Sequence, residues 1–388
     1  MDLHPKGDDV QTLNPQRVTR RTGAAVALVV GGSLLLTACP VDVPADPGTT
    51  TTSTTTTTST TTTTSTTTTT STTTTTLPPL PVCDVPDAPV LTRVSNLETL
   101  PFTIPGGGPI EVATLAPDDD LGSATWTTTS SLALASFSGP TRVVARSASA
   151  TCDPTTIFDA TYDVTPWYSG QSGTSDSPAL AGTDAAFVGW STGYQDYVAG
   201  ADVTVGFQTP NNAVGPYGTD VVVLGNSGRI TMTFLDHPIS NGAGNDLAVF
   251  ENGFVSGSNL FCELAYVEVS SDGVNFVRFD SASRQQTAVS GFATQPPNLL
   301  GGLAGKDAGG YGTPFDLTAL RNKAAVRNGL VDLDHITHVR ILDIVGAPDY
   351  PNAGDRYLDS FGRDIYDAHK TTGSGGFDLR AVGALHQN

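Results

Sequence analysis

Positive charge is scarce in this chain. Of its 388 residues, 19 are Lys or Arg against 38 Asp or Glu, which gives a formal net charge of −19. Such a surface repels the phosphates of nucleic acids and anionic lipid headgroups, so no nucleic-acid partner is expected. It is compatible with divalent cations and neutral glycans, although many exported proteins are acidic merely for solubility.

Several catalytic and metal-binding motifs are also missing. The sequence has no CxxC pair, no P-loop and no GxGxxG followed by a helix, so zinc fingers and nucleotide enzymes are not supported. Gly189–Gly193 matches the G-x-S-x-G nucleophile elbow, but the segment after it is too short for the helix which that elbow requires. Paired carboxylates could still serve a glycan-acting hydrolase, which remains an alternative to binding.

Long hydrophobic runs are absent. The uncharged stretch 23–36 is too short to span a bilayer comfortably, and it follows Arg17, Arg20 and Arg21, as in the core of a signal peptide. It ends in a sequence that looks like a bacterial lipobox, Leu-Thr-Ala-Cys, whose cysteine would be acylated. We predict a lipoprotein signal peptide at residues 1–38, lipidation at Cys39, and export to the outer face of the cell membrane. An ordinary cleaved signal peptide is the alternative.

Cysteines are few as well, with three besides Cys39. Export favours disulfide bonds, and Cys83 and Cys152 bracket one predicted domain, so we predict that they pair. Cys262 lies beside an apolar strand and is expected to be a buried thiol. The odd number of cysteines leaves other pairings open.

A low-complexity segment separates the signal peptide from the rest of the chain. Residues 49–76 are threonine with serine at every sixth position, and they have almost no apolar side chains with which to form a core. We predict a disordered Thr/Ser-rich stalk over residues 39–82. At about 3.1 Å per residue it could reach on the order of 80 Å, which would hold the following domains away from the membrane.

The remaining sequence is rich in short β-type runs separated by turn residues. Residues 83–166 predict an Ig-like β-sandwich that acts as a spacer, and residues 167–388 predict a jelly-roll cell-surface domain. Asp272-Gly273 predicts a hairpin turn between two of the strands. One helix is expected at Pro314–Asn328, with Asp316 as its N-cap. The predicted fold class is therefore all-β, an Ig-like sandwich spacer followed by a jelly-roll β-sandwich with one short helix.

The larger domain also carries a series of ordered motifs. They include Trp190, VVVLG at 221–225, NGAGND at 241–246, VFENGF at 249–254, VEVSSDG at 267–273, LAGK at 303–306, GTPFDL at 312–317 and GGFDL at 375–379. This pattern resembles exported bacterial cell-surface proteins, many of which carry a C-terminal PEP-CTERM sorting signal. VEVSSDG is also similar to discoidin-type, galactose-binding-like jelly rolls. The resemblance implies a fold and a surface location rather than an activity, and lipidation at Cys39 would replace the sorting signal.

Calcium is the expected cofactor. Ca²⁺ takes six to eight hard oxygen ligands, which acidic and amide side chains in Gly-rich loops provide. The candidate metal ligands are Asn245, Asp246, Glu251 and Asn252 around one short strand, and Asp359, Asp364 and Asp367 in a second acidic loop. Further acidic residues near these loops in the sequence are Asp343, Asp355 and Asp378. The alternative is that these residues form turns by bonding their own backbone.

A sugar is the expected ligand. Trp190, Tyr194 and Tyr197 lie close together in the sequence near an acidic residue, and aromatic faces with polar neighbours suit pyranose rings. Packing in the core is the alternative for each ring. We therefore predict a lipid-anchored, calcium-stabilised binding or adhesion protein whose partner is an extracellular glycan or an envelope protein. A hydrolase on the same scaffold and a purely structural envelope protein are the alternatives.

Overall fold

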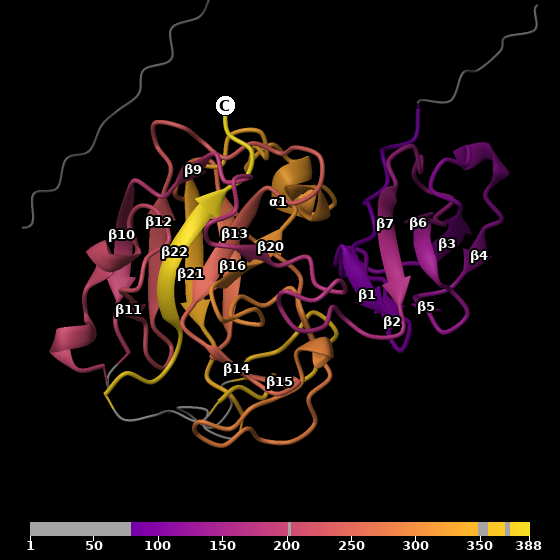
Figure 1. Cartoon of the computed structure of the whole chain (residues 1–388). Helices are drawn as coiled ribbons and strands as arrows, with labels where there is room; N and C mark the ends of the chain where they lie inside the picture. Colours follow the sequence, from indigo (N-terminus) through magenta and orange to yellow (C-terminus); the bar gives the residue numbers. More distant parts are fainter. Residues whose placement is uncertain (1–78, 201–202, 348–355, 369–372) are drawn as a thin grey trace, which may run out of the picture. The chain divides into compact units, whose positions relative to one another are not determined.

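The structure, a computed structural model, describes residues 79–200, 203–347, 356–368 and 373–388 (Figure 1). All of these belong to one compact unit, Thr75–Asn388. The predicted signal peptide, Cys39, most of the predicted stalk and Asp355 lie outside the described residues. Within the described ranges, no helix combines the length and the apolar character needed to cross a membrane.

The N-terminal part of the described chain contains a five-stranded sheet and a separate two-stranded one. The first has the order β1 (Arg93–Ser95), β7 (Phe158–Thr165), β6 (Gly139–Ser147), β3 (Ile110–Leu115), β4 (Thr127–Thr128), and the second pairs β2 (Thr99–Pro101) with β5 (Ser131–Ala133). Along β7 alternate residues are buried, beginning with Phe158, because successive strand residues point to opposite faces of the sheet. The N-terminal part is therefore built of β-strands divided between two sheets.

The C-terminal part contains two larger antiparallel sheets. One has the order β10 (Gly193–Val198), β12 (Arg229–Thr233), β21 (His338–Asp343), β16 (Ala265–Ser270), β17 (Val277–Arg278). The other has the order β11 (Val222–Val223), β22 (Asp378–Ala384), β13 (Leu247–Glu251), β20 (Tyr311–Phe315), β8 (Leu180–Ala181), with β9 (Gly189–Trp190) also paired to β22. One core joins the two sheets and includes Met232 and Ile341 from the first and Val249 and Val382 from the second. The predicted all-β sandwich is confirmed.

Short elements complete this part of the chain. Two small ladders pair β14 (Phe254–Ser256) with β15 (Asn259–Phe261), and β18 (Ala282–Ser283) with β19 (Leu300–Gly301). The 3₁₀ helices are η1 (Leu121–Ser123), η2 (Val205–Phe207), η3 (Pro210–Ala213), η4 (Pro297–Leu299) and η5 (Leu317–Leu320), and the described α-helix is α1 (Ala324–Arg327).

The predicted hairpin is confirmed. β16 pairs antiparallel with β17, and Gly273 between them has a φ of +75°, a conformation that glycine adopts without steric cost. The carboxylate of Asp272 accepts hydrogen bonds from the backbone N–H groups of Val274 and Asn275, both at 2.8 Å. The turn is therefore closed by its own sequence, as Asp-Gly chemistry predicts.

The predicted helix at Pro314–Asn328 is shorter than expected. Pro314 lies in β20, opposite Ala248 of β13, so the first residues of the predicted helix belong to a sheet. Asp316 does act as an N-cap, but of the 3₁₀ helix η5, where its side chain accepts from the N–H of Thr318. Sheet pairing outweighs the local helical preference at this end.

The three cysteines of the described residues behave as predicted. Cys83 and Cys152 form a disulfide bond, and Cys262 is a free, buried thiol. The N–H of Cys83 also donates to the carbonyl of Asp153, so the disulfide joins two segments that already pair through their backbones.

Candidate functional site

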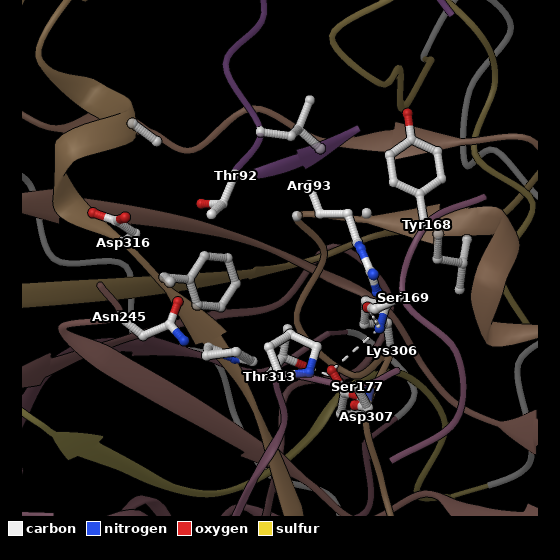
Figure 2. A pocket seen from close by; sticks show the side chains of 18 of the residues that line it. Thr92, Arg93, Tyr168, Ser169, Ser177, Asn245, Lys306, Asp307, Thr313 and Asp316 are labelled. Carbon is white, nitrogen blue, oxygen red and sulfur yellow. Dashed lines mark hydrogen bonds and ion pairs between the residues drawn. The ribbon is translucent and has the colours of Figure 1, made fainter. Parts of the chain in front are cut away.

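A cavity of about 380 Å³ is the candidate ligand site (Figure 2). Its walls come from the segment before and within β1, the segment after Tyr168, the loop before β13, and the residues around β19 and β20. Polar or charged residues of the lining include Thr92, Arg93, Asp163, Ser169, Asp176, Ser177, Asn245, Asp280, Lys306, Asp307, Thr313 and Asp316. Its volume falls in the range of small-molecule sites in proteins.

One wall of the cavity is a buried ion pair. Lys306 and Asp307 are 3 % and 0 % exposed, and the Nζ of Lys306 lies 3.4 Å from the Asp307 carboxylate. The same Nζ donates to the Ser169 hydroxyl at 2.8 Å, while Ser172 and Ser177 donate to Asp307. Figure 2 shows Lys306, Asp307 and Ser177 gathered on one side of the cavity. Buried charges are stable only when they are paired and hydrogen-bonded, so this wall is rigid and polar.

A second charged group in the lining is Arg93, held in place by two carboxylates. Its Nη1 donates to both the carbonyl and the carboxylate of Asp176 at 2.7 Å, and its Nε lies 3.5 Å from the carboxylate of Asp163. The guanidinium group is therefore oriented before any ligand arrives, which reduces the entropy lost on binding.

Asn245 differs from these groups because its amide has no hydrogen-bond partner among the described residues. It lies on the cavity wall together with Asp316, away from the ion pair (Figure 2). A side-chain amide can both donate and accept, so Asn245 is available to a ligand hydroxyl.

The lining as a whole carries five carboxylates against two cationic side chains. An anionic ligand would therefore be repelled, whereas a neutral ligand with several hydroxyl groups meets both donors and acceptors. Apolar surface is present as well, from Phe279 and Phe315, whose ring centroids lie 4.9 Å apart.

The structure does not bring the three aromatic candidates for sugar binding to one exposed surface. Trp190 packs against Phe187 and Phe250, with ring centroids 4.8 and 5.7 Å away. The hydroxyl of Tyr197 donates to the carbonyl of Val223 at 2.8 Å and its ring packs on the core, while Tyr194 is 37 % exposed on a different sheet from Trp190. Trp190 and Tyr197 are thus placed for packing.

The G-x-S-x-G segment is not a nucleophile elbow. Ser191 is 1 % exposed, its hydroxyl donates to the carbonyl of Ala213 at 3.2 Å, and the chain continues from β9 into β10 rather than into a helix. A nucleophilic serine needs an exposed hydroxyl at a strand-to-helix turn.

The first group of predicted calcium ligands is divided by β13. Asp246 and Glu251 stand at opposite ends of this strand, about 17 Å apart at the usual rise per residue. Asp246 accepts from the N–H groups of Gly242 and Leu317, each at 2.7 Å, and lies 2.8 Å from His386. Burial raises the pKa of Asp246, and these contacts oppose the rise. Asp246 and Glu251 therefore do not share an ion.

The other amide and acidic candidates have partners of several kinds. Asn252 accepts from Arg380, the carboxylate of Asp359 pairs with Arg363 at 2.7 Å, and Asp364 pairs with Arg356 at 2.8 Å. Asp367 is buried and accepts from the N–H of Leu264 at 3.1 Å. Among the described residues, no three His, Cys, Asp or Glu side chains stand as a group that could hold a metal ion. Calcium stays a prediction.

A group of carboxyl groups that the sequence did not single out as one cluster is buried near Glu251. Burial, together with the charges of neighbouring carboxylates, raises the pKa of Glu263 to about 11. Burial also raises the pKa of Asp343 and of Asp378 to about 7, and it raises the pKa values of Glu251 and Asp367 strongly.

Little in the sequence indicates the cavity. Its residues lie far apart in the chain, and the available signal was Lys306, one of only four lysines in the sequence and part of the LAGK motif. Asn245 was predicted as a metal ligand, which stays a prediction, and the structure places it in the cavity lining.

Comparison with known proteins adds little. No protein-family model matches the chain, and no curated protein matches it. Among solved structures, the chain is similar to one described as "Structural basis for the promiscuous specificity of the carbohydrate-binding modules from the beta-sandwich super family". The identity is 10 %, the TM-score is 0.16, and the match covers 79 % of this chain and 94 % of that one.

Proposed function

We propose that this protein binds a neutral glycan in the cavity lined by Arg93, Asn245 and the Lys306–Asp307 pair. The observation that carries the proposal is the lining itself. Its charged groups are already fixed by protein partners, and Asn245 is left free among the described residues. Sugar hydroxyls act as donors and acceptors at once, which suits such a mixture, and the excess of carboxylates favours an uncharged ligand.

The test is retention of the full chain on insoluble and arrayed polysaccharides, with Asn245→Ala as the site variant. Asn211→Ala is the matched control, because Asn211 is an exposed asparagine of η3 that does not line the cavity. Weaker retention of Asn245→Ala alone would support the proposal. If Tyr194→Ala reduces retention and Asn245→Ala does not, the glycan binds at β10 and not in the cavity. No retention on any neutral glycan would favour the structural envelope role.

We also propose that the protein is presented on the cell surface by a lipid on Cys39 and by the stalk of residues 39–82. This rests on the lipobox-like sequence and on the resemblance to exported bacterial cell-surface proteins. The division into an Ig-like domain at 83–166 and a jelly-roll domain at 167–388 is part of the same proposal. Metabolic labelling with a radioactive fatty acid tests the anchor, and the label should be absent from Cys39→Ser. Label that persists in this variant would refute the proposed anchor.

A further inference from the structure

The two sheets of the C-terminal sandwich each end in a pair of carboxylates. In one sheet Glu251 is the last residue of β13 and pairs with Leu379, the residue after Asp378 at the start of β22. In the other sheet Asp343 ends β21 opposite Ala265 of β16, and Glu263 lies two residues before it. Register therefore places four acidic side chains at the ends of central strands.

Backbone hydrogen bonds tie Glu263 and Asp343 to the segment that leads into Asp378. The N–H of Gly376 donates to Glu263 Oε1 at 2.9 Å, and the next N–H, of Phe377, donates to Asp343 Oδ1 at 2.7 Å. Asp378 follows directly in the chain. A fifth carboxylate, Asp367, accepts from the N–H of Leu264, beside Glu263.

All members of this cluster are removed from water. The exposed fractions are 2 % for Glu251 and Asp343, 3 % for Glu263 and Asp367, and 9 % for Asp378. Within the described part of the chain, no Lys, Arg or His forms an ion pair with any of the five. Arg380 lies near Asp378, but it donates to the Tyr217 hydroxyl and to Asn252.

One oxygen of the cluster has no partner at all. Asp378 Oδ1 is fully buried and makes no hydrogen bond among the described residues. The charge of Asp378 helps to raise the pKa values of Glu251, Glu263 and Asp343, so Asp378 lies close to these three carboxyl groups. The carboxylate of Asp378 has a hydrogen bond from Asn252 and lies near the charge of Arg380, both of which lower its pKa, yet Oδ1 itself stays unpaired. An unpaired buried carboxylate oxygen is costly, and a bound cation would satisfy it.

We propose that Glu251, Glu263, Asp343, Asp367 and Asp378 bind calcium at this end of the sandwich. The side chains do not enclose an ion as they stand, so binding requires the carboxylates to turn inward. Asp378 Oδ1 has no partner to lose, whereas both oxygens of Asp343 accept backbone N–H groups, from Phe377 and Ser227, and would bind an ion through their remaining lone pairs. Calcium fits better than magnesium, because Ca²⁺ accepts many carboxylate oxygens in irregular geometry, whereas Mg²⁺ keeps several waters that a buried site excludes. The site is independent of glycan binding, since none of its residues lines the cavity.

The test is titration of the chelated full-length protein with calcium chloride, followed by calorimetry and by thermal unfolding. We expect saturable binding and a rise in Tm with calcium concentration, and a smaller rise with magnesium chloride at equal concentration. Asp378→Asn and Glu263→Gln keep the side-chain shapes and should each weaken calcium binding by about 10-fold or more, because calcium affinity depends on the number of charged ligands. Asp236→Asn, which alters an exposed carboxylate, is the matched control and should bind as the unmodified protein does.

Measurements of Tm in chelator show whether a variant binds calcium weakly only because it is misfolded. Without calcium, Asp378→Asn removes like-charge repulsion, so its Tm should equal or exceed that of the unmodified protein. Two results would overturn the proposal. One is the absence of binding heat and of any Tm change in calcium, which would mean that the cluster is held by protons. The other is an equal calcium response in the unmodified protein and both cluster variants, which would place the ion elsewhere.

Discussion

The carboxylates of Glu263 and Asp343 are held by two consecutive backbone N–H groups, those of Gly376 and Phe377. Glu263 lies two residues before the start of β16 and Asp343 ends β21, so these two strands bring both acids to the same short segment. That segment then continues into β22 of the opposite sheet. The contact therefore ties the two sheets together at the end where the buried acidic side chains lie.

This contact between the sheets is most sensitive to substitution at Gly376. Its φ is +83°, and a Cβ at this position would lie 2.7 Å from the backbone of Gly225 and 2.8 Å from Asp343 Oδ1. We expect Gly376→Ala to destabilise the fold by about 1–3 kcal/mol, because the backbone must strain or the segment must move. Chemical denaturation measures the loss.

Gly329→Ala is the control for backbone strain alone. Gly329 also has a positive φ, of +69°, but a Cβ there meets no atom within 4 Å. If the atoms around Gly376 leave no room for a Cβ, Gly376→Ala should lower the free energy of unfolding more than Gly329→Ala does. Of the two variants, Gly376→Ala alone should reduce the rise in Tm that calcium causes. Equal losses of unfolding free energy in the two variants would show that the positive φ angle, and not the contacts of the Cβ, causes the destabilisation.

Asp272 makes the β16–β17 hairpin sensitive to acid. Hydrogen bonds from Asn275 and from the N–H of Val274 hold the pKa of Asp272 well below its usual range. A carboxyl group whose pKa is lowered by folding adds stability above its unfolded pKa, near 3.9, and this stability is lost as the pH falls toward the folded pKa. We expect Asp272→Ala to lower Tm at pH 7 and to lower it less as the pH falls from 4 to 2.

Unfolding curves of the unmodified protein and Asp272→Ala at pH 7, 4 and 2 check this. Other acidic groups titrate equally in both proteins, so the difference between their Tm values isolates Asp272. A difference that stays constant from pH 7 to pH 2 would show that the charge of Asp272 does not hold the turn.

Substitution of Trp190 tests whether its side chain serves packing, as the structure indicates, or ligand binding. Its ring contacts Phe187 and Phe250, in a cluster that also includes Tyr217. Trp190→Ala should cost about 3 kcal/mol of stability, as the loss of a packed aromatic side chain does. Tyr194→Ala, at an exposed site, should cost much less. Thermal unfolding of the two variants measures this, and similar losses would contradict the packing assignment.

These positions show which features could be predicted from sequence. The hairpin at Asp272 was predicted correctly because a turn depends on residues next to each other in the chain. The Cys83–Cys152 pair was predicted because each cysteine lies at one end of a strand-rich segment. The all-β class followed from the frequent turns and short β-type runs, which need no knowledge of strand order.

The candidate sites depend on contacts between distant residues, and there the sequence was a poor guide. Glu251 was grouped with Asp246 because they are close in the chain, yet Asp246 precedes the five-residue strand β13 and Glu251 is its last residue, so Glu251 lies near Asp378 instead. The cavity similarly combines Arg93 with Lys306, more than 200 residues further on. No local pattern encodes such pairings, which arise only when the sheets are assembled.

The ion pair of Lys306 and Asp307 provides the last prediction. Both side chains are buried, and Lys306 also donates to the Ser169 hydroxyl. Lys306→Met keeps much of the volume but leaves the Asp307 carboxylate without its cation, so we expect a loss of about 3–5 kcal/mol in stability. The double variant Lys306→Met/Asp307→Asn should recover part of this loss, because no unpaired charge then remains. If chemical denaturation finds the double variant no more stable than the single one, the cost comes from the cavity's packing rather than from the uncompensated charge.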